Sequence, residues 1–181
     1  KFRPDLACEL VQKEKVNYIE LVPTMADTLT NYEELSQYDL SSVKRIVIGG
    51  ASMTQATHEA LMEIFPGCLV YAGYGMTETG SCATTAIHKD HLNDPPGEEK
   101  IHNMRKAGFV DAVSQVRVIN DKGKDVKPDG MEVGEIIIRG NTVIDEYWRL
   151  PEETKNTIVD GWLYSGDVAV MNEDGYIEIV D

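Results

Sequence analysis

Cysteine is scarce in the sequence, and its placement excludes two classes of small protein. There are three cysteines, Cys8, Cys68 and Cys82, and no two of them form a Cys-x-x-Cys pair. An odd number of widely spaced thiols supports neither a disulfide framework nor a cysteine zinc site. A reducing, cytoplasmic location fits this cysteine usage best.

Long apolar runs and an excess of positive charge are also missing. No apolar stretch approaches the roughly 18 residues that a membrane span requires, so we expect no transmembrane segment. The 17 lysine and arginine residues are outnumbered by 31 acidic residues, which gives a net charge of −14. This balance argues against a nucleic-acid partner, because such a surface needs a basic patch. Nucleotides are not excluded, since backbone N–H groups and a metal ion can hold phosphates.

The composition is otherwise that of an ordinary globular protein, with 42% hydrophobic and 27% charged residues among 181. This length allows one domain with a sizeable core, or one domain and a small satellite. The sequence begins at Lys1 rather than at a methionine, and it ends within an alternating, strand-like segment at 176–181. We therefore expect a fragment of a longer protein, whose exposed strand edge would favour self-association.

The first half of the sequence alternates between helical and strand-like segments. Helices are predicted over about 4–15, 23–31 and 56–65, and strands over 17–22, 43–48 and 68–71. Residues 52–55, Ser-Met-Thr-Gln, fit a capping box at the start of the third helix. Strands that alternate with helices favour an α/β fold with a largely parallel sheet flanked by helices. Residues 1–95 are assigned to this α/β subdomain.

The second half has short strands, frequent turns and few helices. Strands are predicted over 113–119, 134–138, 168–171 and 176–180, with turn signals between them. This pattern is typical of a small antiparallel barrel or sandwich. Residues 96–181 are therefore assigned to an antiparallel β-barrel-like subdomain, which begins after a polar loop that contains two prolines.

The clearest functional signal is the stretch at 71–80, Tyr-Ala-Gly-Tyr-Gly-Met-Thr-Glu-Thr-Gly. It follows a short apolar strand, and we expect Gly73 and Gly75 to bend the backbone sharply there. In open α/β sheets, ligands bind at the carboxyl ends of the strands. A hydroxyl such as that of Thr77 suits a phosphate oxygen, and a carboxylate such as Glu78 suits Mg²⁺ beside a phosphate. Taken alone, the stretch could also be only a turn and a helix start.

Two further segments offer groups of a similar kind. Gly49, Gly50 and Ala51 follow the strand at 43–48, and they would share an edge with the first stretch if the two strands are parallel neighbours. In the segment at 160–167, Asp-Gly-Trp-Leu-Tyr-Ser-Gly-Asp, a turn at Ser165 and Gly166 is expected before Asp167. An ionised carboxylate can accept hydrogen bonds from both ribose hydroxyls at once.

The four histidines give no metal signature. His88, His91 and His102 fall in a polar segment without a cysteine partner, so we expect solvated side chains. His58 falls on the polar face of the third helix and is expected to be exposed.

The motifs Tyr74-Gly-Met-Thr-Glu78 and Ser165-Gly-Asp167 resemble signatures of the adenylate-forming superfamily of acyl-CoA synthetases, luciferases and peptide-synthetase adenylation domains. The resemblance extends over nearly the whole chain and is weakest at 88–106. Met76 favours an acyl- or aryl-CoA ligase, and a fatty-acid–CoA synthetase is the member most similar. The resemblance places the chain in the large N-terminal domain, with residues 1–95 as the end of its nucleotide-binding subdomain.

The resemblance implies that a carboxylate attacks the α-phosphate of ATP and that the thiol of coenzyme A then displaces AMP. The implied partners are ATP or AMP, Mg²⁺, coenzyme A and a small-molecule carboxylate. Thr77 and Glu78 would be catalytic, with Glu78 as the metal ligand. The implied nucleotide-binding residues are Gly49, Gly50, Ala51, Gly73, Tyr74, Gly75, Met76, Thr77 and Asp167. Gly80, Ser81 and Cys82 would line the acyl pocket.

Two parts of the family pattern are missing from the sequence. There is no phosphate loop that ends in lysine, and the family keeps its adenylation lysine in a small C-terminal domain. We therefore expect this chain to be inactive alone. The alternatives are an adenylation domain of a peptide synthetase, a luciferase-like enzyme, and a non-catalytic nucleotide-binding module.

Overall fold

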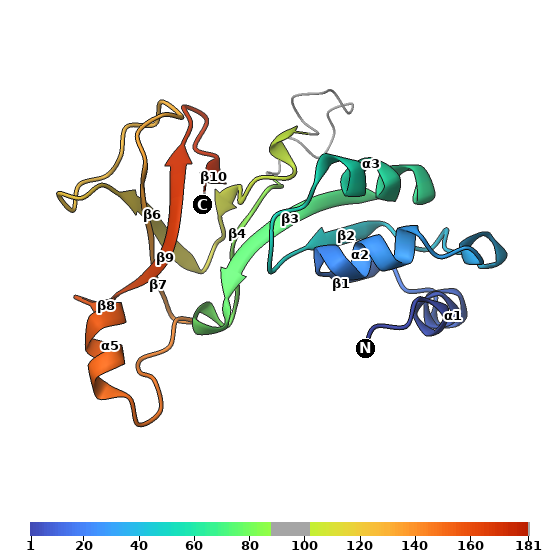
Figure 1. The fold of residues 1–181 in the computed structure, drawn as a ribbon, viewed down its shortest axis with the longest axis horizontal. Helices are drawn as coiled ribbons and strands as arrows, with labels where there is room; N and C mark the ends of the chain where they lie inside the picture. The colour runs from blue at the N-terminus through green and yellow to red at the C-terminus, as the bar shows by residue number, and fades with distance from the viewer. Residues whose placement is uncertain (88–101, 181) are drawn as a thin grey trace. The chain divides into compact units, whose positions relative to one another are not determined.

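The computed structural model describes residues 1–87 and 102–180, which belong to two compact units (Figure 1). The first unit takes in residues 1–72 and 98–105, and the second takes in 73–97 and 106–181. The division falls inside strand β3 (Leu69–Met76), between Ala72 and Gly73. The boundary that the sequence predicts near residue 95 lies outside the described residues and stays a prediction.

In its described residues, the first unit consists of a parallel sheet section flanked by helices. Strands β1 (Tyr18–Leu21) and β2 (Arg45–Ile48) pair in parallel, and β2 pairs in parallel with the first half of β3. The helices are α1 (Pro4–Glu14), α2 (Pro23–Thr30) and α3 (Gln55–Ile64), with a 3₁₀ turn, η1 (Leu35–Gln37), after α2. The predicted parallel sheet flanked by helices is therefore confirmed.

The helix starts follow from local chemistry. Pro4 and Pro23 open α1 and α2, where the missing N–H of proline costs nothing. Helix α3 is capped by Thr54, whose Oγ1 accepts a hydrogen bond from the N–H of Thr57 at 3.1 Å. The capping box predicted at Ser52 is therefore wrong by two residues, because the hydroxyl that reaches the free N–H belongs to Thr54.

His58 is fully buried, so the prediction that it is exposed is wrong. On α3 it shares the buried face with Thr57 and Leu61, at the spacing of one helical turn. Its Nε2 lies 3.0 Å from the carbonyl oxygen of Val70, and because a carbonyl only accepts, Nε2 carries the proton. Burial lowers the pKa of His58, and the positive charge of Arg105 lowers it further.

The second unit is mainly antiparallel. One sheet has the order β10-β9-β7-β6, with a short strand, β8 (Ile158–Val159), also paired to β9. Its strands are β6 (Ser114–Ile119), β7 (Gly134–Gly140), β9 (Trp162–Met171) and β10 (Ile177–Ile179). Strands β4 (Ser81–Thr85) and β5 (Phe109–Val110) continue antiparallel from the second half of β3, and α5 (Pro151–Thr157) precedes β8. The predicted antiparallel β subdomain is confirmed.

Two glycine segments that the sequence predicts as turns are bulges inside strands. Strand β3 continues through Gly73, Tyr74 and Gly75, and its pairing with β4 shifts register between Tyr74 and Gly75. Strand β9 likewise crosses Ser165 and Gly166, where its pairing with β7 shifts register and Gly166 adopts φ +80°. Both turn predictions are wrong because cross-strand pairing continues on either side of the glycines.

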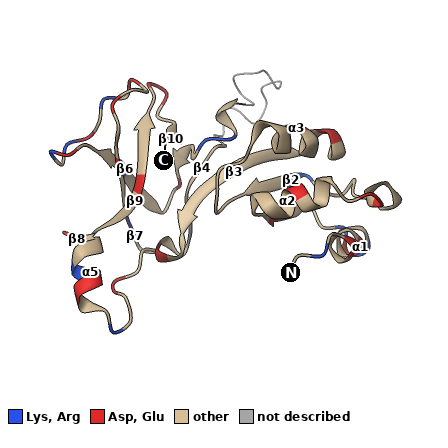
Figure 2. Cartoon of the chain, in the orientation of Figure 1, with Lys and Arg blue, Asp and Glu red and all other residues tan. Residues whose placement is uncertain are grey.

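Charged residues and helices are distributed over the described parts of the chain. The lysine and arginine positions are scattered over the described parts of both units and do not gather on one element (Figure 2). Within the residues that the structure describes, no helix is both long enough and apolar enough to cross a bilayer.

Candidate functional site

Tyr74 and Asp167, two residues of the predicted nucleotide site, are in direct contact in the second unit. The hydroxyl of Tyr74 donates a hydrogen bond to Oδ2 of Asp167 at 2.7 Å. The ring of Tyr74 is only 9% exposed and packs in the hydrophobic core of the unit. Burial raises the pKa of Tyr74 well above its ordinary value, and the carboxylate of Asp167 raises it further. The phenol therefore stays protonated and holds the Asp167 carboxylate in one orientation.

The bulge in β9 fixes the backbone on which Asp167 is carried. The hydroxyl of Ser165 donates to the carbonyl of Ile136 at 2.7 Å and accepts from the N–H of Asp167 at 3.1 Å. The N–H of Gly166 donates to Oε1 of Glu135 at 3.0 Å. The Ser165 hydroxyl and the Gly166 N–H are thus tied to the neighbouring strand β7, and Asp167 is carried on a paired strand rather than on a loop.

Glu78 lies in a tight turn that directly follows β3. The turn is the 3₁₀ segment η2 (Thr77–Thr79), and Thr79 closes it by exchanging hydrogen bonds with the backbone of Met76 at 2.9 and 3.0 Å. Gly80 ends the turn in the left-handed conformation at φ +72°. The sharp change of direction that the sequence predicts at Gly73 and Gly75 thus occurs several residues later.

The segment between β7 and α5 lies against this turn. The N–H of Ile144 donates to the carbonyl of Glu78 at 2.9 Å, and the hydroxyl of Tyr147 donates to Oε1 of Glu78 at 2.9 Å. Partial burial and the adjacent Glu78 carboxylate raise the pKa of Tyr147. Tyr147 is not among the residues that the sequence predicts for the site. Glu78 and Tyr147 are 69 residues apart, and no pattern in the sequence indicates that their side chains are in contact.

The other predicted residues divide between the two units. Gly49, Gly50 and Ala51 belong to the first unit and follow β2, whose last residue Ile48 pairs with Ala72. Gly50 has φ +78°, a conformation that L side chains rarely adopt. The placement of these three residues toward Glu78 and Asp167 stays a prediction.

The predicted acyl-pocket residues begin strand β4. Gly80 precedes the strand, and Cys82 is half-buried in it, paired with Gly75 across the sheet. Ser81 is the first residue of β4. Their role toward an acyl group stays a prediction.

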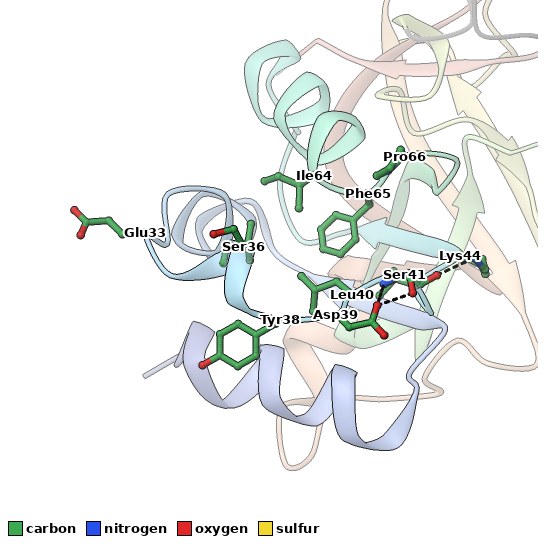
Figure 3. Close-up of a pocket in the computed structure, with 12 residues that line it drawn as sticks. Glu33, Ser36, Tyr38, Asp39, Leu40, Ser41, Lys44, Ile64, Phe65 and Pro66 are labelled. Atoms are coloured by element: carbon green, nitrogen blue, oxygen red, sulfur yellow. Dashed lines mark hydrogen bonds between the residues drawn. The ribbon is translucent and has the colours of Figure 1, made fainter.

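A hollow of about 650 Å³ lies at the other end of the sheet in the first unit (Figure 3). It is bounded by Lys44, which directly precedes β2, and by Phe65 and Pro66, which precede β3. The amino ends of the strands therefore face it, whereas ligands of open α/β sheets bind at the carboxyl ends. Its polar groups also bind one another, because Asp39 accepts from the N–H of Ser41 at 3.1 Å. The hollow is therefore not the predicted nucleotide site.

The described residues contain no group of three or more histidine, cysteine or acidic side chains that could hold a metal ion. Glu78 contributes one carboxylate, and Tyr147 occupies one of its two oxygens. Mg²⁺ is commonly bound through one or two carboxylates together with the phosphates of a nucleotide. A single carboxylate therefore fits an ion that arrives with a nucleotide, and the role of Glu78 as its ligand stays a prediction.

Comparison with protein families and curated proteins points to one class of enzyme. A family model described as AMP-binding enzyme matches residues 1–148. The chain is 34% identical over 176 residues to 4-hydroxybutyrate–CoA ligase 2 of Metallosphaera sedula, covering 97% of this chain and 32% of that protein. It is 31% identical over 179 residues to the long-chain-fatty-acid–CoA ligase of Thermus thermophilus, covering 98% of this chain and 33% of that protein.

The fold has counterparts among solved structures. The amide bond synthetase McbA of Marinactinospora thermotolerans matches with a TM-score of 0.83 at 28% identity, covering 100% of this chain and 34% of that one. The chain thus spans about a third of the length of the relatives it matches.

Proposed function

The chain belongs to the AMP-binding enzyme family, and from this premise we propose that it is part of an AMP-forming acyl-CoA ligase. The two curated relatives named above are both CoA ligases. The observation that carries the proposal is the hydrogen bond from Tyr74 to Asp167, because it joins the two family motifs across 93 residues of sequence within one unit.

The proposed site divides its work between two carboxylates. Asp167 accepts hydrogen bonds from the ribose hydroxyls of ATP, while Tyr74 holds its Oδ2 and orients the group. Gly73, Gly75 and Met76 frame the adenine from the second unit. The adenine-binding role expected of residues 49–51 belongs to the first unit and stays a separate prediction. The ring of Tyr74 is too deeply packed to be mainly a stacking surface, so its hydroxyl is its main contribution.

The second carboxylate serves the phosphates. In this proposal, Glu78 would hold Mg²⁺, and Thr77 would contact a phosphate oxygen. When bound, Mg²⁺ would neutralise charge that develops on the phosphates, the kind of stabilisation that usually contributes most to catalysis. Both residues lie in the short turn η2, so a small shift of this turn would misplace them together.

The proposed reaction has two steps. A carboxylate oxygen of the acid attacks the α-phosphorus of ATP and expels pyrophosphate, which gives an acyl-adenylate. The sulfur of coenzyme A then attacks the acyl carbon and expels AMP, and the thiol proton is released. Gly80, Ser81 and Cys82 would line the acyl pocket, and the enzyme would act in the cytoplasm.

For the carboxylic acid substrate, we propose a chemical class rather than one compound. The names of the two relatives specify a short hydroxy acid and a long-chain fatty acid, so the family resemblance allows acids of very different length. We take a fatty acid as the first candidate. A second candidate function is transfer of the acyl group to an amine, which the match to the amide bond synthetase favours.

The test uses the full-length protein that carries this chain. Exchange of labelled pyrophosphate into ATP, dependent on an added carboxylic acid, measures the first step, and thioester formation measures transfer to coenzyme A. We expect both activities with at least one acid in a series from C4 to C16. Exchange without any thioester, together with product formation on an added amine, would favour the second candidate. No exchange with any acid would overturn the proposed function.

A further inference from the structure

Glu78 is held by residues 142–147, between β7 and α5, which are separate from the motifs at 74–78 and 165–167. Two hydrogen bonds join them, one from the N–H of Ile144 to the Glu78 carbonyl and one from the Tyr147 hydroxyl to Oε1, both at 2.9 Å. The segment also approaches Gly80 so closely that a Cβ placed there would lie 3.1 Å from the carbonyl oxygen of Thr142. The same segment therefore forms hydrogen bonds with both the backbone and the side chain of Glu78.

Tyr147 is itself fixed in place by the start of α5. Its N–H donates to Oγ1 of Thr154 at 2.9 Å, and that hydroxyl donates to the carbonyl of Leu150 at 2.9 Å. The N–H of Leu150 donates a hydrogen bond to the carbonyl of Tyr147 at 3.1 Å, which closes a tight turn. With its backbone anchored in this way, Tyr147 presents its hydroxyl to Glu78 from a fixed base.

The chemistry of the contact divides the two oxygens of the carboxylate. An ionised carboxylate only accepts hydrogen bonds, and a phenol hydroxyl has one proton to donate. Oε1 takes that proton, and Oε2 has no hydrogen-bond or ion-pair partner within the described residues. The hydrogen bond to Oε1 therefore fixes the orientation of the Glu78 carboxylate. It leaves Oε2 for an incoming cation.

We propose that Tyr147 is a positioning residue that orients the Glu78 carboxylate toward a divalent cation bound to a nucleotide. This inference rests on the proposed function, which supplies the metal–nucleotide complex. Hydrogen bonds to ligating carboxylates fix their orientation, and loss of such a partner commonly costs 10- to 100-fold in metal affinity or activity. The hydroxyl itself touches neither metal nor substrate in this proposal.

The chain contains a matched control for this contact. The hydroxyl of Tyr32 donates to Oε2 of Glu34 at 2.9 Å, which is the same pair of groups at the same distance, in the first unit and outside the residues of the predicted site. Tyr147→Phe and Tyr32→Phe each delete one phenol oxygen that binds a glutamate. A difference between the two variants therefore reports on the position of Glu78 rather than on the loss of a surface hydrogen bond.

The experiment measures binding as well as turnover in the full-length protein. Titration calorimetry with ATP is done with Mn²⁺ and in EDTA, and the Mg²⁺ dependence of pyrophosphate exchange is followed in parallel. In Tyr147→Phe we expect the Mn²⁺–ATP affinity to fall about 10-fold and the Mg²⁺ concentration for half-maximal exchange to rise similarly. The affinity for metal-free ATP should be unchanged. Tyr32→Phe should match the wild type in every measurement.

Each result either supports or overturns the proposal. Equal loss of affinity with and without metal in Tyr147→Phe, or a wild-type metal response, overturns the positioning role and leaves the proposed function intact. A wild-type protein that binds ATP no better with Mn²⁺ than in EDTA overturns the metal role of Glu78, and the positioning role with it. If Tyr147→Phe is unstable, Thr154→Val, which loosens the anchor of Tyr147, should give a smaller loss of the same sign.

Discussion

The hydroxyl of Tyr74 lies 2.7 Å from Oδ2 of Asp167, although 93 residues separate the two in the sequence. Tyr74 belongs to the bulged end of β3, and Asp167 belongs to the bulge of β9. Tyr74 keeps the alternation of buried residues along β3, in phase with Val70 and Ala72, and the register shift follows it. Asp167 instead directly follows the bulge at Ser165 and Gly166, and bulges are common next to functional sites.

Substitutions of Asp167 and Glu78 should reduce the activity of the full-length protein with different dependences on Mg²⁺. Asp167→Ala removes hydrogen bonds from a charged group worth about 1.5–3 kcal/mol each. The kcat/KM for ATP in pyrophosphate exchange should then fall roughly ten- to several-hundred-fold, and added Mg²⁺ should not restore it. Glu78→Gln should instead recover part of its activity at high Mg²⁺. Identical Mg²⁺ curves for the two variants would contradict separate roles.

Tyr74→Phe should destabilise the second unit and weaken nucleotide binding together. The hydroxyl binds a charged partner in a mostly buried position, so its loss should lower the free energy of unfolding by about 1.5–3 kcal/mol. Tyr164→Phe is the control, because Tyr164 lies in β9 and its hydroxyl makes no hydrogen bond within the described part of the chain. Urea unfolding and AMP titration measure the two effects. An AMP affinity equal to that of the control would show that Asp167 does not need Tyr74.

Gly166→Ala should impair nucleotide binding beyond its cost in stability. Gly166 and Gly123 both have positive φ, +80° and +69°, and a Cβ at either position would meet no atom within 4 Å. Alanine at each position should therefore cost a similar backbone strain of about 1–2 kcal/mol. Only Gly166→Ala disturbs the bulge that carries Asp167, so only this variant should lose AMP affinity at a temperature where both are folded. Equal AMP affinities would argue against a role for the bulge.

His58 should make stability depend on pH below neutrality. Burial lowers its pKa in the folded state, so the unfolded chain binds more protons as the pH falls below about 6.5. The stabilisation is therefore present above that pH and is lost as the pH falls toward the folded-state pKa, by up to about 1.4 kcal/mol per pH unit. His58→Gln should flatten this dependence in urea unfolding measured from pH 7.5 to 5. His102→Gln, at an exposed position, should keep the wild-type slope.

The 181-residue chain by itself should associate and should not catalyse exchange. Leu10, Tyr18 and Val22 are 54%, 45% and 40% exposed. Strand β1 is the last strand of its sheet in the described part of the chain, with one edge unpaired. Exposed apolar side chains beside an unpaired edge favour association, so light scattering should find species larger than a monomer. Leu10→Lys should reduce the association, and a sharply monomeric wild-type chain would contradict this expectation.

Much of the fold could be predicted because its signals are local. The alternation of helices and strands in the first half and the short strands in the second half are set by periodicity and by proline and glycine within a few residues. The starts of α1 and α2 follow from Pro4 and Pro23 in the same way. The two family motifs are also local, so the sequence was enough to select Tyr74, Glu78 and Asp167 as candidates.

The tertiary structure alone decided how these residues are held. Glycine segments at 73–75 and 165–166 look like turns locally, and only pairing with β4 and β7 makes them bulges within continuous strands. His58 is buried because α3 packs that face inward against β3, whatever the polarity of the side chain. The partners of Asp167 and Glu78 lie 93 and 69 residues away. Such contacts depend on sheet register and loop packing, whose energies come from the whole unit rather than from the residues near the motif.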